Sequence, residues 1–256
     1  MIKKLTRKIA HRLGLWLTYD FFLLAGTFCF LYFRIVNRTR IIGKRNIPRQ
    51  SRLTIIASNH ESMHDSWVGG TSAYFPDFLA WPSRAPYHLA AKENFAGNWL
   101  IRFILRRFRA IPIDRGKFNR DLLDQIIQLL QNANVWIFYQ GTRSYDLTKA
   151  RNGTAYLIAN CQPTPTVIPA YLHGTAKLFG GKPGDHGGLG RWLPRFPGFG
   201  RKVTVVFGKS INFEDILENP NDPEIYDKIT SRIIEAVKNL QDQAKGTSPI
   251  LEKTLA

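Results

Sequence analysis

The residues best suited to chemistry lie in one short stretch, Asn59-His60-Glu61-Ser62-Met63-His64-Asp65. Two patterns overlap there. His-Glu-x-x-His is a zinc-protease pattern, which needs two imidazoles one turn apart on the same face of a helix. His-x4-Asp instead makes His60 a general base and lets Asp65 orient the other nitrogen of its ring. The two patterns require different local structure, so the surrounding elements discriminate between them.

Helix geometry favours the second pattern. Residues five apart on a continuous α-helix point about 140° away from each other, so His60 and Asp65 can meet only if His60 precedes the helix. The apolar, β-branched run at residues 53–57 predicts a buried strand that ends just before His60. A zinc-protease helix would begin well upstream of its first histidine, and His173 is a weak candidate for a third ligand. A zinc peptidase and a purely structural His60 remain as alternatives.

Three further blocks follow in order: Arg109-Ala110-Ile111-Pro112-Ile113-Asp114-Arg115, Phe138-Tyr139-Gln140-Gly141-Thr142-Arg143-Ser144 and Val167-Ile168-Pro169. Together with Asn59-His60-x4-Asp65, they resemble the motifs of the glycerolipid acyltransferase superfamily, typified by 1-acyl-glycerol-3-phosphate acyltransferases. The resemblance spans roughly residues 53 to 212. It implies transfer of a fatty acyl group from an acyl-CoA or acyl-ACP thioester to the free hydroxyl of a lysophospholipid. Lysophosphatidic acid, giving phosphatidic acid, is the expected acceptor.

The third block departs from the family pattern at two positions. Tyr139 stands where the family usually has proline, and Gln140 where it usually has glutamate. Glutamine keeps a hydrogen-bonding end but has no charge and cannot accept a proton. The resemblance associates this position with the acyl acceptor, so the departure bears on the identity of the acceptor more than on the reaction. A different lysolipid acceptor is therefore an alternative.

Acyl transfer to a hydroxyl needs a base for the alcohol proton, and histidine suits that task near neutral pH. We expect His60 to act as this base and Asp65 to set its tautomer and stabilise the imidazolium. Backbone amides of the strand-to-helix turn, or of Gly141 and Thr142, could stabilise the oxyanion. No metal or cofactor is expected.

A phosphate on the acceptor would need fixed cations. Arg115 and Arg143 are the first candidates and Lys92 is the third, with a solvated surface charge as the alternative for each. The full set of residues predicted to bind substrate is Asn59, Lys92, Arg115, Gln140, Gly141, Thr142 and Arg143.

Alternating elements must position these residues. Besides residues 53–57, strands are expected at 87–91, 110–113, 135–139, 166–171 and 203–207, and helices at 66–74, 99–108, 121–131 and 223–244. This alternation predicts an α/β fold: a single mixed-sheet domain flanked by helices, with an N-terminal membrane-associating helical segment. Residues 175–202, rich in Gly and Pro, are expected to form a long surface loop.

Residues 1–45 are predicted to be the membrane-associating segment and residues 46–256 the acyltransferase domain. Basic residues flank an aromatic, apolar run at residues 13–33 that contains a single charge, Asp20. A spanning helix needs about 20 apolar residues, so a helix lying in the interface is favoured over a single span or a buried core helix. No signal-peptidase site follows, so the segment is expected to stay attached. The predicted location is the cytoplasmic face of the cell membrane.

The overall charge agrees with an anionic partner. The 256 residues include 36 Lys+Arg against 19 Asp+Glu, a net charge of +17, and a mean hydropathy of −0.20 excludes a polytopic membrane protein. No DNA- or RNA-reading motif is present, so an anionic membrane surface is favoured over nucleic acid. The stripe of Arg102, Arg106, Arg107 and Arg109 is expected to be a solvated helix face, with contact to lipid headgroups or an acidic acyl carrier as the functional alternative.

Overall fold

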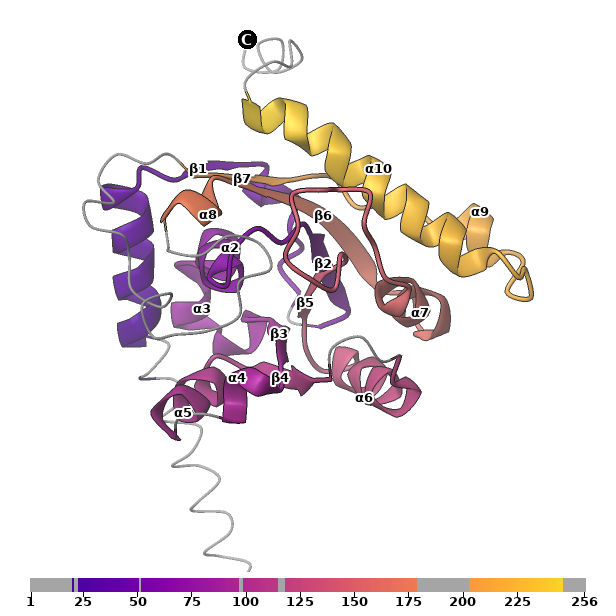
Figure 1. The fold of residues 1–256 in the computed structure, drawn as a ribbon, viewed down its shortest axis with the longest axis horizontal. Coiled ribbons are helices and arrows are strands. Elements are labelled where there is room, and N and C mark those ends of the chain that lie inside the picture. The colour runs from indigo at the N-terminus through magenta and orange to yellow at the C-terminus, as the bar shows by residue number, and fades with distance from the viewer. Residues whose placement is uncertain are drawn as a thin grey trace, which may run out of the picture.

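The computed structural model describes residues 20, 23–50, 52–96, 99–114, 118–178 and 203–245. A seven-stranded sheet runs through them in the order β1-β7-β6-β2-β5-β3-β4 (Figure 1). All neighbouring strands are parallel except β6 and β7. The strands are β1 (Arg40–Ile42), β2 (Thr54–Ser58), β3 (Tyr87–Ala91), β4 (Ala110–Ile113), β5 (Val135–Phe138), β6 (Thr166–His173) and β7 (Thr204–Phe207).

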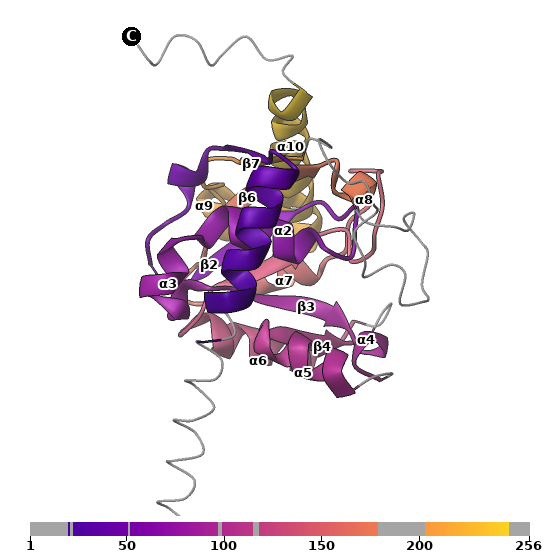
Figure 2. The same ribbon diagram turned by 90° about the vertical axis from the view of Figure 1, so that its left-hand side faces the viewer.

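Helices cover both faces of this sheet (Figures 1 and 2). On one face lie α6 (Arg120–Leu130), α7 (Gly153–Asn160) and α10 (Ile225–Lys245). On the other lie a helix over residues 23–31 and α2 (Asp65–Tyr74). The remaining helices are α3 (Asp77–Ala80), α4 (Glu93–Ala96), α5 (Trp99–Arg107), α8 (Thr175–Leu178) and α9 (Glu214–Leu217), with short turns η1 (Tyr32–Val36), η2 (Lys44–Asn46) and η3 (Pro82–Arg84).

Strand β2 is buried on both faces, which explains its continuous apolar sequence. Ile55 and Ala57 join the core formed with α6, α7 and α10. Ile56 points the other way, into the core formed with α2 and the helix over residues 23–31. Because β5 and β6 pair with β2 on either side, the end of this strand is a rigid place from which to present the residues that follow it.

The structure confirms the predicted mixed sheet flanked by helices, and adds elements that the sequence did not predict. Helix α7 is buried nearly all round, so it lacks the amphipathic period that reveals a surface helix. Strand β1 is only three residues long. It lies before residue 46, so the sheet begins within the segment that the sequence assigned to membrane association.

The described residues include only part of the predicted loop at residues 175–202 and part of the apolar run at residues 13–33. Thr175–Leu178, at the start of the predicted loop, is helix α8, while residues 179–202 lie outside the described residues. Residues 13–19, 21 and 22 of the apolar run also lie outside them. Among the residues that are described, no helix is both long enough and apolar enough to cross a bilayer.

Two adjacent glycines make a matched test of how closely α2 packs on the sheet. A Cβ at Gly69 would lie 2.5 Å from the Trp136 ring, whereas a Cβ at Gly70 would meet nothing within 4 Å. Alanine exceeds glycine in helix propensity by about 1 kcal/mol, so Gly70→Ala should leave stability unchanged or raise it. Gly69→Ala should lower the free energy of unfolding by about 1–3 kcal/mol, because α2 must move away from Trp136. Urea unfolding measures both, and equal stability of the two variants would contradict this close packing.

Candidate active site

The predicted catalytic residues lie at the carboxyl ends of the central parallel strands, where open α/β sheets usually bind ligands. Strand β2 ends at Ser58 and α2 begins at Asp65, so His60 stands in the turn between them. His64 is the N-cap of α2. The two histidines therefore do not share a helical face, and the geometry required by the zinc-protease alternative is not formed. Within the described ranges, no group of three or more potential ligands could hold a metal ion.

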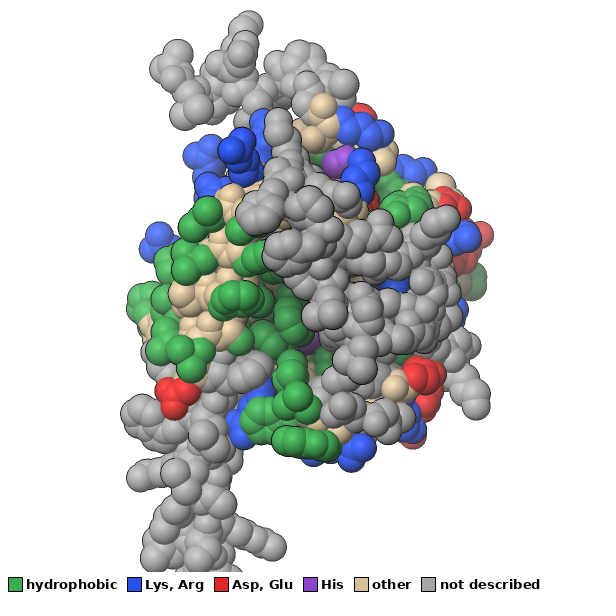
Figure 3. Space-filling view, turned by 60° about the vertical axis from the view of Figure 1, so that its left-hand side comes forward, with side chains coloured by type: hydrophobic (Ala, Val, Ile, Leu, Met, Phe, Trp, Pro, Cys, Tyr) green, Lys and Arg blue, Asp and Glu red, His purple; other side chains and the backbone are tan. Residues whose placement is uncertain are grey.

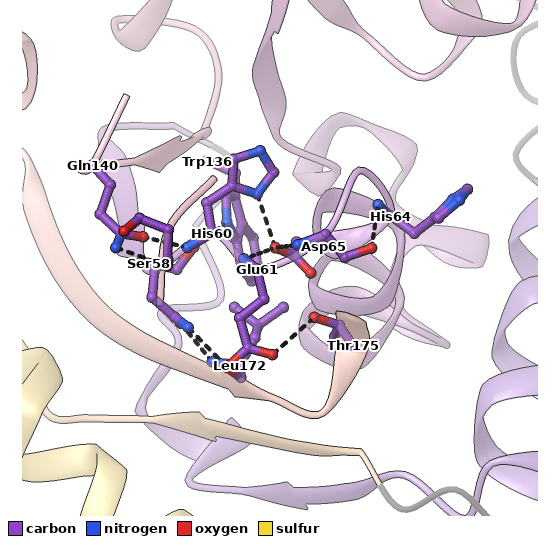
Figure 4. A network of polar contacts seen from close by, with 12 residues as sticks. Ser58, His60, Glu61, His64, Asp65, Trp136, Gln140, Leu172 and Thr175 are labelled. Atoms are coloured by element: carbon purple, nitrogen blue, oxygen red, sulfur yellow. Dashed lines mark hydrogen bonds and ion pairs between the residues drawn. The ribbon is translucent and has the colours of Figure 1, made fainter. Parts of the chain in front are cut away.

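His60 and Asp65 form an ion pair across this turn (Figure 4). The His60 Nδ1 atom lies 2.8 Å from Asp65 Oδ2. The same oxygen accepts hydrogen bonds from the backbone N–H groups of Glu61 at 2.6 Å and Ser62 at 2.8 Å. Asp65 is fully buried, while the His60 side chain is 19% exposed. Because a carboxylate only accepts, the His60 Nδ1 atom donates its proton to Asp65, and Nε2 is the nitrogen that carries the lone pair in the neutral ring.

The buried side chain of Gln140 is hydrogen-bonded to the main chain of His60 (Figure 4). Its Oε1 atom accepts the His60 N–H at 2.6 Å, and its Nε2 group donates to the carbonyls of Ser144 at 3.1 Å and Asp146 at 2.7 Å. The side chain is 1% exposed. An ionised glutamate has no hydrogens for those two carbonyls, which gives a physical reason for glutamine at this position.

Asn59 is also bonded within the protein. Its Nδ2 group donates to the Leu172 carbonyl at 2.9 Å, and its Oδ1 atom accepts the Leu172 N–H at 2.7 Å. The amide therefore joins the end of β2 to β6. Both Asn59 and Gln140 were predicted to contact substrate; in the structure their side-chain polar atoms bond within the protein, and neither is part of the wall of the cavity beside His60.

A cavity of about 120 Å³ opens beside His60. Its wall includes Gly141, Thr142 and Arg143, as predicted for substrate-binding residues, and Phe138, on which the His60 ring stacks with ring centres 4.0 Å apart. Three residues of this wall, Ser66, Trp67 and His88, also line a second cavity of about 50 Å³. That second space runs beneath α2 toward Gly26 and Cys29, so two cavities with shared walls extend from His60 to the helix over residues 23–31.

A larger cavity of about 470 Å³ lies between α6 and α7 and shares Phe138 and Gly141 with the cavity of His60. Its wall includes Arg151, which sequence reasoning missed. Gly141 has φ of +64°, and a Cβ there would lie 2.3 Å from Arg151 Cδ, so glycine lets the arginine lie across it. The Arg151 N–H donates to the Tyr139 carbonyl at 3.0 Å. Only this folding back of the loop brings the two residues together, and no sequence spacing signals it.

The other predicted cations occupy different environments. Lys92 is 66% exposed, and its Nζ lies 3.5 Å from Asp114 Oδ1, away from the lining of the His60 cavity. Arg115 lies outside the described residues. Within the arginine stripe, Arg109 is not a solvated residue, because its guanidinium donates to the Ala85 carbonyl at 2.6 Å. Burial lowers the pKa of Arg109.

Most amides of the expected oxyanion site are already in use. Those of Glu61 and Ser62 donate to Asp65, and that of Gly141 donates to the Phe138 carbonyl at 2.9 Å. In the part of the chain that the structure describes, the Thr142 N–H donates to no group. The same holds for the Met63 N–H, and both residues line this cavity, so each amide is a candidate donor to an oxyanion.

Glu61 is a second buried carboxyl group beside the pair. Its Oε2 accepts the Gly174 N–H at 3.1 Å and the Thr175 hydroxyl at 3.5 Å. Burial, together with the charge of Asp65, raises the pKa of Glu61 to about 7. Glu61 therefore ties the turn before α2 to the start of α8, and does so at an electrostatic cost near neutral pH.

Comparison with known proteins agrees with the order of the motifs. The Acyltransferase family matches residues 38–173, which is more than half of the chain. The chain is 29% identical over 167 residues to an N-acylphosphatidylethanolamine synthase of Arabidopsis thaliana, a match that covers 62% of this chain and 56% of that protein. It thus spans little more than half the length of this relative.

The fold has a counterpart among solved structures. The crystal structure of the 1-acyl-sn-glycerophosphate (LPA) acyltransferase PlsC from Thermotoga maritima superposes with a TM-score of 0.52. The match covers 92% of this chain and 83% of that one at 18% sequence identity. At this identity the likeness concerns the fold.

Glu61 should make the stability of the protein depend on pH. Its pKa is 4.5 in the unfolded chain and about 7 in the folded one, so the folded state binds the proton more tightly. The free energy of unfolding therefore falls as pH rises through this window. Glu61→Gln should remove this loss. Between pH 4.5 and 7, its free energy of unfolding should rise relative to that of wild type by about 1–3 kcal/mol. Denaturant unfolding at several pH values tests this, with exposed Glu235→Gln as the control. Parallel pH curves for wild type and Glu61→Gln would contradict the assignment.

Proposed function

This chain belongs to the acyltransferase family, and from that premise we propose that it transfers a fatty acyl group from a carrier thioester to the free hydroxyl of a lysophospholipid. The observation that carries the proposal is the His60–Asp65 pair, 2.8 Å apart, at the edge of a cavity lined by Gly141, Thr142 and Arg143. Lysophosphatidic acid is the first candidate acceptor, and acyl-CoA or acyl-ACP is the donor.

The proposed reaction is direct transfer with His60 as the base. His60 Nε2 removes the proton of the acceptor hydroxyl as that oxygen attacks the thioester carbonyl, and Asp65 stabilises the imidazolium. The Thr142 N–H stabilises the oxyanion of the tetrahedral intermediate. The C–S bond then breaks, and the proton on His60 passes to the departing thiolate, which leaves an ester and a free thiol.

The surroundings of His60 suggest where each substrate binds. The acyl chain of the donor follows the largely apolar cavity beneath α2, past Trp67, toward the helix over residues 23–31. The phosphate of the acceptor binds on the other side of His60, where Arg143 and Arg151 stand beside Gly141. This division keeps the apolar chain and the charged headgroup on separate walls, with the reacting carbonyl between them.

A second candidate acceptor is the amine of phosphatidylethanolamine. The relative from Arabidopsis thaliana is called an N-acylphosphatidylethanolamine synthase, and the same base could remove a proton from an attacking amine. We propose this acceptor as the alternative to a lysophospholipid.

We propose that the protein docks on the cytoplasmic face of the cell membrane. The helix over residues 23–31 and the turn after it bury Cys29 and Phe33 against the core but expose Leu24, Phe28, Leu31 and Ile35, which share one helical face. Their exposed fractions are 73%, 68%, 47% and 66%. Figure 3 shows hydrophobic side chains gathered on this side of the molecule, with Lys and Arg around them. An apolar face with a basic border suits an anionic bilayer.

The activity is tested with purified protein, both donor types and a panel of acceptors: lysophosphatidic acid, other lysophospholipids, monoacylglycerol and phosphatidylethanolamine. We expect acylation of a phosphate-bearing lysolipid, and a loss of about 10²–10⁴-fold in kcat for His60→Ala because the base is removed. Thiol release and product analysis measure the reaction. His173→Gln, outside the cavity, is the matched histidine control.

Three results would count against this proposal. Full activity of folded His60→Ala removes the base mechanism. Acylation of monoacylglycerol alone overturns the roles of Arg143 and Arg151. Acylation of phosphatidylethanolamine alone selects the second candidate.

Membrane docking is tested by flotation with vesicles containing anionic lipid. Leu24→Glu and Phe28→Glu should each weaken binding about tenfold or more, because burying a large apolar side chain stabilises by about 1.5–3 kcal/mol. Asn239→Glu on α10 adds the same charge on the opposite face of the sheet and should leave binding nearly unchanged. Equal loss in all three variants would mean that net charge, not the apolar face, drives attachment.

A further inference from the structure

The narrow cavity beneath α2 has a largely apolar wall, but Ser66, Thr71, Tyr74 and His88 also line it. His88 is 7% exposed and Tyr74 is 1% exposed. The Tyr74 hydroxyl is buried without a hydrogen-bond partner. Within the described part of the chain, the His88 ring nitrogens also form no hydrogen bond; only its backbone N–H does, to the Arg109 carbonyl at 3.2 Å.

The buried, unpaired Tyr74 hydroxyl is the unusual group in this cavity. More than 90% of buried polar groups in proteins are hydrogen-bonded, and leaving one unpaired costs about 1–3 kcal/mol. A purely apolar cavity lining could have phenylalanine or leucine at both positions. The pair therefore points to a partner that enters the cavity.

The chemistry of the pair restricts that partner. Burial lowers the pKa of His88 to about 4, so the ring is neutral at physiological pH and offers one donor and one acceptor. The Tyr74 hydroxyl is also neutral and can donate or accept. Neutral groups of this kind suit a neutral hydrogen-bonding group.

The position of His88 restricts it further. His88 lines both the cavity beside His60 and the cavity beneath α2. It thus stands where the first carbons of an acyl chain would lie when its thioester carbonyl is near His60. The space beneath α2 is about 50 Å³, more than the roughly 10–15 Å³ of cavity that one water-sized group needs.

We propose that His88 and Tyr74 form a polar subsite that selects acyl donors with a hydroxyl near the thioester, such as β-hydroxyacyl thioesters. This inference rests on the proposed acyl transfer and specifies its donor. The chain hydroxyl hydrogen-bonds to the neutral His88 ring, and the Tyr74 hydroxyl completes the polar lining. An unsubstituted chain leaves these groups unpaired, which is the situation in which binding sites discriminate most strongly.

The test is a competition between tetradecanoyl and β-hydroxytetradecanoyl donors on the same carrier. Wild type should favour the hydroxylated donor by roughly tenfold or more in kcat/KM. His88→Leu should abolish this preference and raise kcat/KM for the plain donor, since the unpaired ring is gone. Tyr74→Phe removes a single atom, so it retains the fold, and it should reduce the preference several-fold. Tyr226→Phe on α10 is the matched control and should leave the ratio unchanged.

The outcomes separate this inference from the proposed reaction. If wild type favours the plain donor, the subsite is refuted. It is also refuted if His88→Leu and Tyr74→Phe both keep the wild-type preference for the hydroxylated donor, and the two groups then hold only water. If neither donor reacts with any acceptor, acyl transfer itself fails. Binding of free tetradecanoic and β-hydroxytetradecanoic acids, measured by calorimetry on wild type and Tyr74→Phe, then decides the subsite independently of activity.

Discussion

One oxygen of Asp65 organises the turn on which the proposed chemistry depends. It receives the His60 ring and the amides of Glu61 and Ser62, while the other oxygen is buried without a partner. Burying a carboxylate is costly unless donors surround it, and here the donors come from the turn itself. Asp65 is also the first residue of α2, so its negative charge lies at the positive end of the helix dipole. The turn must close around this carboxylate, and closing it presents His60 to the cavity.

Two buried side-chain amides tie that turn to neighbouring segments of the chain. Asn59 ties it to β6 through Leu172, and Gln140 ties it to the loop after β5. The contacts of Gln140 also explain why this chain has glutamine where the family usually has glutamate. Because its Nε2 group donates to two carbonyls, neutrality is what this position requires in this chain. Of the residues predicted to bind substrate, Gly141, Thr142 and Arg143 line the cavity beside His60.

The high positive charge divides among several tasks once the fold is known. Part of it is structural, because Arg109 is half-buried and its guanidinium donates to the Ala85 carbonyl. Part is neutralised locally, as at Lys92 beside Asp114. Arg143 lines the cavity of His60 and Arg151 lines the larger cavity next to it, and these two arginines are the cations of the proposed phosphate site. The apolar face of the helix over residues 23–31 and the largely apolar cavity beneath α2 lie on the same side of the sheet, so one layer of the molecule would serve both the bilayer and the acyl chain.

The sequence alone determined the features that local pattern encodes. Apolar runs of strand length and helical periodicity predicted the mixed α/β sheet and most of its elements, and the strand ending before His60 predicted that His60 and Asp65 would meet. It could not reveal α7, which is buried nearly all round and so has no amphipathic period, or β1, which is too short to carry one. Tertiary structure decided the rest. Hydrogen bonds between distant segments turned Asn59 and Gln140 inward, brought Arg151 across Gly141, and left His88 and Tyr74 unpaired in one cavity. Such pairings depend on how the chain folds back on itself, and no spacing along the sequence records them.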